Sequence, residues 1–566
     1  MDIKLEIENL IKESLKKIDI GFLKNIEIVH PDILDHGDYT CNIAMILAKK
    51  ENKNPRELAE QIKAYISNHE YIEKIEIAGS GFINFYLSKK FYQFSLKEIF
   101  EKKENWGKNQ ILRGKVFLAE HTDPNLFKEI HAGHLMTNAI GESIYRIAGF
   151  SDADTKNITF QGDVGLHIAK AIWGIKNIGE ELPKNKIPFE KQKFLGQCYV
   201  FGEKNFSENE DVKNNILKIN KNIYTREDDE QNKIYDLGCK WSLEYLETIY
   251  KLLGSKFDYY FLESETFKDG QRIVEENIGK IFKKSNGAII FEGSKYGLHD
   301  RVFINSEGLP TYEAKDIGLF YKKWEKYNPD ISMTVTGSEQ EQYFEIVQKA
   351  GGMINSEWEE KTVHLAHGKL KLSSGKMSSR EGKIIRAQEW INSAIESIID
   401  KMKDREIDEE SVKEISKKIA IAGIKYSILK VSAGKDIVYD EKKALDFAGN
   451  SGPYLQYSYV RANSILKKVE EINLDISVRK GNISGLEKLI YRFPEEIKKS
   501  LKFYSSHYIA NYLYELASEF NFFYGNTKIL DKNNEDYFYN LVLVKSFAQT
   551  IKNGLYLLGI ETVDKM

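Results

Sequence analysis

Two histidines, His131 and His134, stand where the pattern of a strand gives way to that of a helix. The segment before them, KVFLAEH (115–121), has the continuous apolar run of a buried strand. The first turn of a helix offers unpaired N–H groups and the positive end of the dipole, and Gly133 leaves room for a close ligand. The spacing therefore predicts a site for nucleotide phosphate, with both imidazoles on one side of the turn. Apolar residues then continue at helical spacing: Leu135, Ile140, Ile144, Ile147 and Ala148.

A second segment with cationic side chains, LSSGKMSSREGK (372–383), lies far downstream. It is rich in Gly and Ser and carries Lys376, Arg380 and Lys383, so it is too polar to be buried. Transfer of a phosphoryl or nucleotidyl group needs stabilisation of negative charge on the phosphate oxygens more than it needs a protein nucleophile. We therefore expect this loop to be a second clamp on the nucleotide that the histidines bind.

Strands and helices alternate around both segments. Such alternation predicts right-handed crossovers, a Rossmann-like doubly wound parallel sheet, and a ligand at the carboxyl ends of its strands. The expected strands are 115–121, 152–160, 287–293, 301–308, 331–337 and 362–370. The expected helices start near 131, 161, 310 and 338, and a polar, mostly helical insertion is expected at about 184–240.

Two further regions flank this α/β part. Residues 1–108 predict a small α+β domain, with helices at 1–18 and 54–66 and two strands joined through Gly79 and Gly81. Residues 389–566 are almost wholly helical in pattern and predict an all-α helical bundle. The expected domains are therefore 1–108, 109–388 and 389–566, which suits a chain of 566 residues.

Composition limits the class of protein. Lys and Arg number 82 against 85 Asp and Glu, so any surface for nucleic acid must be local. Cys41, Cys198 and Cys239 are scattered and support neither a structural zinc nor a disulfide framework. The amino-terminal helix lacks the apolar core of a signal peptide, and no run reaches the ~18 apolar residues of a membrane span. We expect a soluble cytoplasmic protein without a membrane partner.

HAGH together with KMSSR resembles the paired HIGH and KMSKS signatures of class I aminoacyl-tRNA synthetases, and the surrounding residues resemble the arginyl-tRNA synthetase family in particular. Segments 36–50 and 78–88 are similar to the amino-terminal domain of that family, which contacts the corner of the tRNA. Segments 449–466, 510–524 and 552–566 resemble its DALR-type anticodon-binding domain. Three regions of different composition thus indicate the same family.

The resemblance implies an activity. Arginine, ATP and tRNA(Arg) would give arginyl-tRNA(Arg), AMP and pyrophosphate through an arginyl-adenylate, with Mg²⁺ sharing the phosphate charge. It also implies attack by the 2′-hydroxyl of the terminal adenosine, activation that requires bound tRNA, and a monomer. A guanidinium is always charged and fits a planar fork of acceptors, so L-arginine as a substrate requires buried carboxylates.

The resemblance also assigns residues. Catalytic roles fall to His131, His134, Lys128 and Lys376, and no metal ligand is implied. Binding of ATP falls to His131, Gly133, His134, Gly337, Lys376, Met377 and Ser378. Binding of arginine falls to Asn125, Glu263, Tyr312, Asp316 and Gln340, with Tyr312 and Asp316 four residues apart on one helix. Contact with tRNA falls to Tyr454, Tyr457, Arg461 and Met566.

The sequence departs from the family pattern at two positions. Ser379 replaces the second lysine of KMSKS, and Lys128, just before the HAGH motif, is the expected substitute, with Arg380 and Lys383 as helpers. Val164 stands in GDVG, where the family more often has tryptophan.

Other interpretations remain open from the sequence. The histidines are alternatively metal ligands, although no third ligand stands at a recognisable spacing. Each acid of the expected pocket, taken singly, is alternatively a solvated surface charge. The whole chain is alternatively another class I synthetase or a non-catalytic tRNA-binding paralogue.

Overall fold

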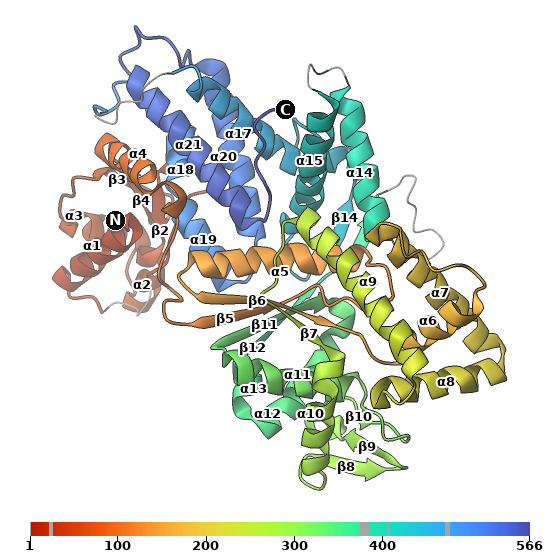
Figure 1. Ribbon diagram of the computed structural model, residues 1–566. Helices are drawn as coiled ribbons and strands as arrows, with labels where there is room; N and C mark the ends of the chain where they lie inside the picture. The colour runs from red at the N-terminus through yellow and green to blue at the C-terminus, as the bar shows by residue number, and fades with distance from the viewer. Residues whose placement is uncertain (1, 22–25, 374–384, 404, 406–407, 470–475) are drawn as a thin grey trace. The chain divides into compact units, whose positions relative to one another are not determined.

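The computed structural model describes residues 2–21, 26–373, 385–403, 405, 408–469 and 476–566 (Figure 1). Lys376, Met377, Ser378, Arg380 and Lys383 lie outside the described residues. The chain divides into two compact units. One comprises Met1–Trp106, Ser458–Pro494 and Glu515–Asn553, and the other comprises Gly107–Tyr457, Glu495–Tyr514 and Gly554–Met566.

A five-stranded parallel sheet organises the unit that contains both signature motifs. Its order is β12-β11-β5-β6-β7, and every neighbouring pair is parallel. Strands β6 and β7 lie on one side of β5, and strands β11 and β12, which come later in the chain, lie on its other side. The strand order thus reverses at β5, and in sheets of this kind ligands bind beyond the carboxyl ends of the strands at that point. The predicted Rossmann-like sheet is confirmed. The strands are β5 (Val116–Glu120), β6 (Asp154–Gln161), β7 (Tyr259–Leu262), β11 (Ile331–Gly337) and β12 (Thr362–His367).

The sequence pattern differs from this sheet in two places. It assigns no strand to β7, because Tyr259–Leu262 is only four residues long and runs directly into a charged helix. It does predict strands at 287–293 and 301–308, but these form a separate antiparallel sheet of order β10-β9-β8. The members of that sheet are β8 (Phe282–Ser285), β9 (Ala288–Phe291) and β10 (Arg301–Ile304).

Helices connect the parallel strands as expected. Helix α5 (Ala132–Phe150) follows β5, and α6 (Leu166–Asn177) follows β6. The expected insertion is helical and extends beyond its predicted end, because its third helix continues to Leu253. Its helices are α7 (Pro188–Glu208), α8 (Glu210–Thr225) and α9 (Asp229–Leu253), and α12 (Glu341–Ile354) and α13 (Ser356–Glu360) lie between β11 and β12.

Two helices approach each other unusually closely at one edge of the sheet. They are α10 (Glu263–Glu276) and α11 (Tyr312–Tyr327). A Cβ atom at Gly270 would overlap the carbonyl oxygen of Ala314, and one at Gly318 would overlap that of Thr266. Glycine at both positions lets the two backbones touch, which brings the first residue of α10 beside the first turns of α11.

The rest of this unit is mainly helical. Helices α14 (Ala387–Met402), α15 (Glu409–Leu429) and α16 (Glu441–Ala444) follow the second signature segment. One departure from the all-α expectation is β14 (Ile437–Tyr439), which pairs in parallel with β13 (Leu370–Leu372). The short strand escapes prediction because three residues carry no detectable period.

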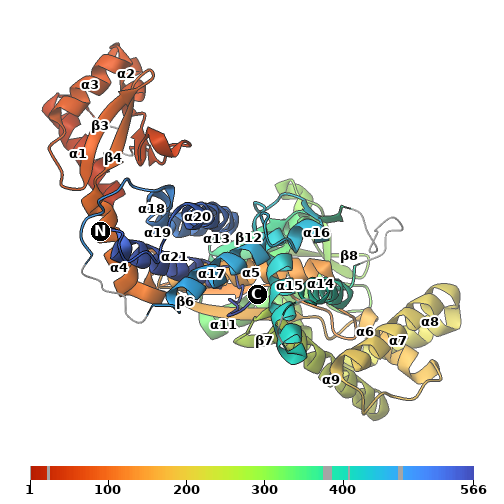
Figure 2. The ribbon, with the colours of Figure 1, turned by 90° about the horizontal axis from the view of Figure 1, so that it is seen from above.

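The other unit combines the amino-terminal module with parts of the carboxyl-terminal helices (Figure 2). Its four-stranded sheet has the order β1-β2-β4-β3, with strands β1 (Ile28–Val29), β2 (Tyr39–Cys41), β3 (Ile72–Ala78) and β4 (Phe82–Leu87). Tyr491 belongs to the same buried core as this module, so segment 458–494 folds with residues 1–106. The domain limits proposed from the sequence remain a prediction. The helices of the module are α1 (Ile3–Lys17), α2 (Ile43–Glu51), α3 (Pro55–Tyr65) and α4 (Lys89–Lys102).

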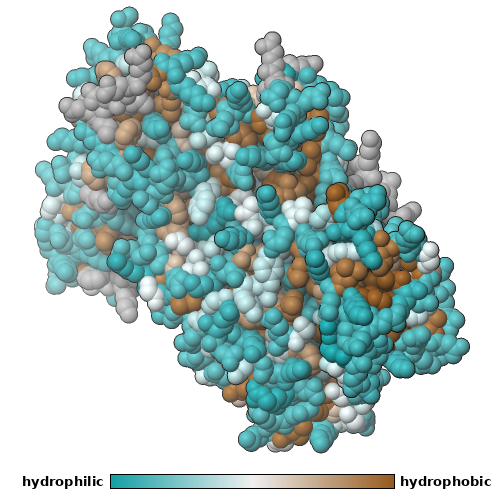
Figure 3. Space-filling view, viewed as in Figure 1, coloured by the Kyte–Doolittle hydropathy of each residue, from teal (hydrophilic) through white to brown (hydrophobic). Residues whose placement is uncertain are grey.

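Five further helices supply the carboxyl-terminal segments. They are α17 (Gly452–Leu466), α18 (Gly485–Ile490), α19 (Phe493–Lys502), α20 (His507–Asn526) and α21 (Tyr537–Leu557). Hydrophilic side chains cover most of the face shown in Figure 3. Within the described ranges, no helix combines the length and the apolar character that crossing a bilayer requires.

The contact between α10 and α11 gives a test of the fold. Replacing Gly270 with alanine should force the two helices apart and lower the free energy of unfolding by about 1 to 3 kcal/mol, because the added methyl group has no space. Gly525→Ala is the control, since nothing lies within 4 Å of a Cβ there. Thermal and urea unfolding of both variants measure the effect. Equal midpoints would contradict the packing described.

Candidate active site

The two signature histidines cap the start of α5. The Nδ1 atom of His131 accepts a hydrogen bond from the backbone N–H of Gly133 at 3.1 Å, and Nδ1 of His134 accepts from the N–H of His131 at 3.0 Å. A ring nitrogen that accepts from an N–H group carries no proton, so the proton of each neutral ring is assigned to Nε2. Both imidazoles therefore present an Nε2–H donor.

Burial keeps both rings neutral. Desolvation lowers the pKa of His131, which nearby Lys128 lowers further, and it lowers the pKa of His134 well below its ordinary value. The ring centroids are 3.9 Å apart. The pair thus offers two adjacent neutral donors at the positive end of a helix dipole, which suits charge that grows on a ligand.

Gly133 is needed between them. A Cβ atom there would lie 2.9 Å from Cε1 and 3.0 Å from Nδ1 of His131. Any side chain would therefore push the ring of His131 out of the capping position.

The residues that follow the second signature segment lie against the first one. The N–H of Ala132 donates to the carbonyl of Ile385 at 2.9 Å, and the N–H of Ala387 donates to the carbonyl of Ile130 at 3.0 Å. Arg386 also forms an ion pair with Glu129 at 3.4 Å. The described end of the second segment is thus fixed beside the histidines, while the roles of Lys376, Met377 and Ser378 stay predictions.

Lys128, the expected substitute cation, lies on the loop that leads to the histidines. Its Nζ atom is 4.1 Å from the ring centroid of Tyr199 on α7. Burial lowers the pKa of Lys128, and the nearby carboxylate of Glu203 opposes that shift.

The two acids of the expected pocket lie on the closely packed helices α10 and α11. Glu263, the first residue of α10, is only 3% exposed, and the hydroxyl of Tyr343 donates to Asp316. Desolvation raises the pKa of Glu263, and it raises the pKa of Asp316 to about 7. The negative charge of Glu263 contributes to the raised pKa of Asp316. The interpretation as a solvated surface charge is wrong for Glu263, whereas Asp316 is partly exposed and accepts a hydrogen bond from Tyr343.

Sequence reasoning missed a lysine in this pocket. The Nζ atom of Lys315 is 2.8 Å from Oε2 of Glu263, and both side chains are 4% exposed. Eight residues later, Lys323 pairs with Glu120 at the end of β5. The available signal was the charged residues of EAKD directly before the apolar stretch IGLF, because a lysine that is buried with such a stretch requires an acid.

Asn125, another expected pocket residue, is held at the end of β6. It forms an isolated bridge with Gly162, and a Cβ atom at Gly162 would overlap its Oδ1. The backbone N–H of Leu126 donates to the carbonyl of Gly162 at 2.9 Å. The carboxyl ends of β5 and β6 therefore meet at this residue, as the sheet predicts.

The remaining candidates lie in different settings. Gly337 ends β11 and pairs with His367, and the carboxylate of nearby Glu339 partly opposes the lowering of the His131 pKa by burial. Tyr312 begins α11 and is 54% exposed, and Gln340 is exposed on the turn after β11. Neither side chain is buried, but the ring centroid of Tyr312 lies 4.8 Å from Nζ of Lys315, the partner of Glu263.

The candidates for contact with tRNA are partly exposed. Tyr454 and Tyr457 lie on α17, and the ring of Tyr454 is 5.8 Å from that of Tyr514. Arg461 donates to Asn521 at 2.5 Å and lies 4.8 Å from the ring of Tyr524. Met566 is half-buried. These contacts place Arg461 beside one aromatic side chain, Tyr524.

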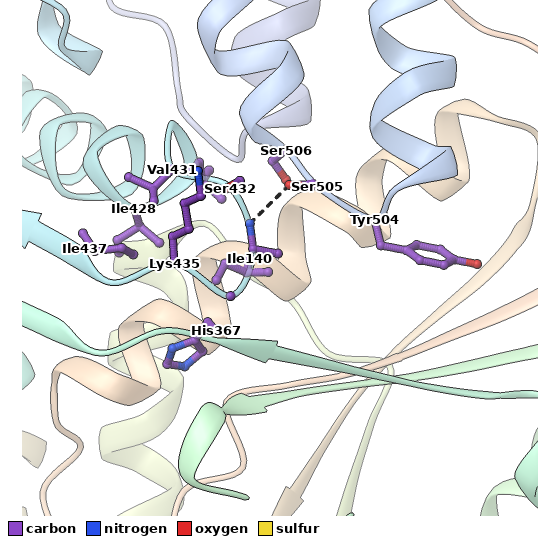
Figure 4. Close-up of a pocket in the computed structure, with 13 residues that line it drawn as sticks. Ile140, His367, Ile428, Val431, Ser432, Lys435, Ile437, Tyr504, Ser505 and Ser506 are labelled. Carbon is purple, nitrogen blue, oxygen red and sulfur yellow. Dashed lines mark hydrogen bonds between the residues drawn. The ribbon is translucent and has the colours of Figure 1, made fainter. Parts of the chain in front are cut away.

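A cavity near the end of β12 is too small for a substrate (Figure 4). It has a volume of about 20 Å³, room for one water molecule. Its lining includes His367, Ile140 and the loop at 431–435, whose Ala433 N–H donates to Ser505 at 3.4 Å. Among the described residues, no three His, Cys, Asp or Glu side chains are grouped to hold a metal ion.

Family models match most of the chain. The model described as the class I (R) tRNA synthetase catalytic domain matches residues 95–440. Those for the arginyl tRNA synthetase N terminal domain and the DALR anticodon binding domain match residues 5–87 and 455–566.

Individual proteins match over their full length. The chain is 32% identical to Arginine--tRNA ligase of Borrelia hermsii, over 100% of this chain and 99% of that protein. It is 30% identical to the enzyme of that name from Clostridium perfringens, over 99% of this chain and 100% of that protein. Arginyl-tRNA synthetase from Thermus thermophilus has the same fold, with a TM-score of 0.80 and 22% identity over 99% of each chain. The structure of arginyl-tRNA synthetase from Plasmodium falciparum has a TM-score of 0.79 and 24% identity, over 100% of this chain and 99% of that one.

The pair between Lys315 and Glu263 predicts a stability effect. Lys315→Met should lower the free energy of unfolding by about 3 to 5 kcal/mol at pH 8, because it leaves a buried carboxylate unpaired. The loss should shrink as the pH falls, since a protonated Glu263 needs no cation. Urea unfolding at pH 8 and pH 5 measures both effects.

Lys322→Met supplies the control on the same helix. Lys322 is 30% exposed and pairs with Asp269 and Glu325, so its loss should cost less than about 1 kcal/mol. Equal losses in the two variants would contradict a special role for the buried pair.

Proposed function

The chain belongs to the class I arginyl-tRNA synthetases, and on this premise we propose that it joins L-arginine to tRNA(Arg) with ATP through an arginyl-adenylate. The observation that supports this most directly is the arrangement at the carboxyl ends of the parallel strands. Two neutral Nε2–H donors stand at the start of α5, and the buried acid Glu263 and the partly buried acid Asp316 lie on the helices packed at the same sheet. One group suits phosphate, and the other suits a guanidinium.

In the first step, the carboxylate of arginine attacks the α-phosphorus of ATP. A new phosphorus–oxygen bond forms, the bond to the bridging oxygen breaks, and pyrophosphate leaves. The protein contributes position and charge stabilisation, not a nucleophile. The Nε2–H groups of His131 and His134 donate to phosphate oxygens, the first turn of α5 at Gly133 admits ATP closely, and Lys128 and Lys376 balance the charge that moves to pyrophosphate. Gly337, Met377 and Ser378 complete the ATP site.

Mg²⁺ bound with ATP would supply further positive charge on the phosphates. Among the described residues, no three His, Cys, Asp or Glu side chains are grouped to hold the ion without the nucleotide. In the second step, the 2′-hydroxyl of the terminal adenosine of tRNA attacks the carbonyl carbon of the adenylate and forms an ester bond. The bond from that carbon to the phosphate oxygen breaks, AMP leaves with its electrons, and the hydroxyl proton passes to the leaving phosphate or to water.

Selection of arginine depends on charge. The fork of N–H donors in a guanidinium matches carboxylate oxygens. Lys315 neutralises the charge of Glu263, so Asp316 supplies the negative charge for the ligand. Asn125 holds the α-amino end, and Tyr312 and Gln340 close the exposed side. A pocket built this way rejects uncharged side chains, since they would leave the buried acid unpaired.

The partner is tRNA(Arg). Tyr454, Tyr457, Arg461 and Met566 are proposed to contact it, because aromatic faces stack on unpaired bases and arginine pairs with phosphate. The enzyme is proposed to act as a monomer in the cytoplasm. The alternative, a tRNA-binding paralogue without catalysis, makes the opposite prediction in the assay that follows.

One assay separates these functions. The protein is incubated with ATP, total tRNA and each amino acid in turn, and charged tRNA is measured. Charging with arginine alone supports the proposal. Charging with another amino acid would overturn the substrate, and binding of tRNA without any charging would favour the paralogue.

The tautomers of the histidines predict losses of different size for two substitutions of His134. His134→Asn keeps an acceptor near Nδ1 but removes the Nε2–H donor, so kcat for adenylate formation should fall about 100- to 1000-fold. His134→Gln keeps a donor near Nε2 and should lose less. Pyrophosphate exchange measures both rates, and the KM for arginine should change little. The reverse order of the two rates would contradict the proton assignment.

The pKa of Asp316 predicts how arginine binding depends on pH. Tyr343 donates to this carboxylate, Lys323 stabilises its ionised form, and Glu120 and Glu263 disfavour it. Because its pKa is about 7 and the guanidinium binds the ionised form, a proton must leave when arginine binds below pH 7. Affinity should therefore fall up to about tenfold per pH unit below 7 and level off above it.

Calorimetry between pH 5.5 and 8 measures this slope and the proton released. Asp316→Asn should bind arginine more weakly and should lose most of the slope. An unchanged slope in that variant would assign the titration to another group, such as the neighbouring carboxyl of Asp123, whose pKa burial also raises.

A further inference from the structure

The loop between β5 and α5 has a strained backbone. Thr122, Asp123 and Phe127 have φ values of 78°, 41° and 62°, a region that residues with side chains rarely adopt. Such conformations persist only where surrounding contacts determine them. Since Lys128 follows Phe127, whatever holds this loop also sets the position of the lysine.

One face of α7, the first helix of the insertion, contacts this loop. The side-chain amide of Gln192, a residue only 1% exposed, donates to the carbonyl of Lys128 at 2.7 Å. A Cβ atom at Gly196 would lie 3.4 Å from the carboxylate of Glu129. The ring centroid of Tyr199 is 4.1 Å from Nζ of Lys128. The spacing of 192, 196 and 199 puts all three on one side of the helix.

A second helix of the insertion, α9, holds the other part of the loop. Ser242 accepts a hydrogen bond from the N–H of Phe127 at 3.0 Å, and a Cβ atom at Gly238 would overlap the Phe127 ring. Phe127 is fully buried. Helices α7 and α9 pack against each other (Figure 1), so together they fix the backbone just before Lys128.

The ring of Tyr199 is itself held in place. Its hydroxyl donates to Oε2 of Glu203 at 3.1 Å, and Lys170 donates to the same oxygen at 2.8 Å. With its edge fixed, the ring turns its negative face to the ammonium of Lys128. The half-buried lysine thus meets a directed aromatic face, in a setting where its charge is poorly hydrated.

We propose that Tyr199 is a positioning residue, through which the inserted helices hold the Lys128 ammonium where the leaving pyrophosphate needs it. This inference rests on the proposed function, since Lys128 acts on phosphate there. It assigns the insertion a part in the chemical step. It also explains how one lysine on a loop serves in place of the missing second lysine of the KMSKS motif.

The test compares variants that keep or remove the aromatic face. Tyr199→Phe keeps it and should retain kcat for pyrophosphate exchange within about threefold, whereas Tyr199→Leu should lower kcat about threefold to thirtyfold, the range of a cation–π contact. The KM for arginine should not change in either. Tyr199→Met, whose longer and unbranched side chain reaches further than leucine without a π face, replaces the leucine variant if that protein does not fold.

A matched control lies on the same helix. Phe201 stacks on Trp173 of α6, with ring centroids 5.5 Å apart, and so makes an aromatic contact outside the group Tyr199, Glu203, Lys170 and Lys128. Phe201→Leu should therefore leave kcat unchanged. A drop equal to that of Tyr199→Leu would show a general effect on α7 and would overturn the inference.

A double-mutant cycle with Lys128→Met separates the two proposals. If Tyr199 acts through Lys128, then Tyr199→Leu adds no further loss once the lysine is gone. Additive losses, or a normal kcat in Tyr199→Leu beside a low one in Lys128→Met, would overturn the inference and leave the proposed function intact. A normal kcat in Lys128→Met would overturn the proposed role of Lys128 and the inference with it.

Discussion

The two hydrogen bonds from backbone N–H groups to imidazole Nδ1 atoms at the start of α5 determine the chemistry of the site. They satisfy N–H donors that the first turn of a helix leaves without partners, and so they stabilise the fold. They also fix the proton of each ring on Nε2, and so they determine which ring nitrogen can donate to the substrate. One local interaction thus serves structure and chemistry together, and the parallel sheet determines where it occurs, because α5 starts at the carboxyl end of β5.

The second constraint is the distribution of buried charge along α11. Lys315, Asp316 and Lys323 occupy one side of that helix, and each lysine has an acid from another element: Glu263 from α10 and Glu120 from β5. Asp316 is bound by a neutral hydroxyl instead. A pocket of this kind carries a negative charge that no lysine within it cancels directly. It can therefore accept one cationic group without leaving a buried charge unpaired after binding.

The sequence predicted the parts of this site that depend on local rules. Helix start, strand end and the spacing of HAGH follow from periods of 3.6 and 2, and the acids follow from a family pattern. The sequence did not predict Lys315 as the partner of Glu263, nor Tyr199 as the contact of Lys128, because both pairs join elements far apart in the chain. Strand β7 was missed for a related reason: four residues give no period, and only pairing with β6 makes them a strand.

The far part of α5 is also held by charged groups, which matters for the histidines because a helix moves as a rigid body. Arg146 of α5 donates to the carbonyls of Gly254 at 2.8 Å and Tyr556 at 2.9 Å. Buried Lys425, on the neighbouring helix α15, donates to the carbonyls of Leu253 at 2.6 Å and Gly559 at 2.7 Å. These carbonyls lie at helix ends, where the negative end of the dipole favours a cation. Burial lowers the pKa of Lys425 to about 7, and the carboxylate of Glu142 opposes the shift.

These contacts join α5 to the ends of α9 and α21, and α9 is also one of the helices that hold the Lys128 loop. The two supports of the phosphate site, the start of α5 and the loop before it, therefore share a common partner in the insertion. Displacing α9 would alter both the direction of α5 and the position of Lys128. The inserted helices are thus part of the framework on which the geometry of the site depends, and this explains why their buried face carries glycine and serine where the loop requires close contact.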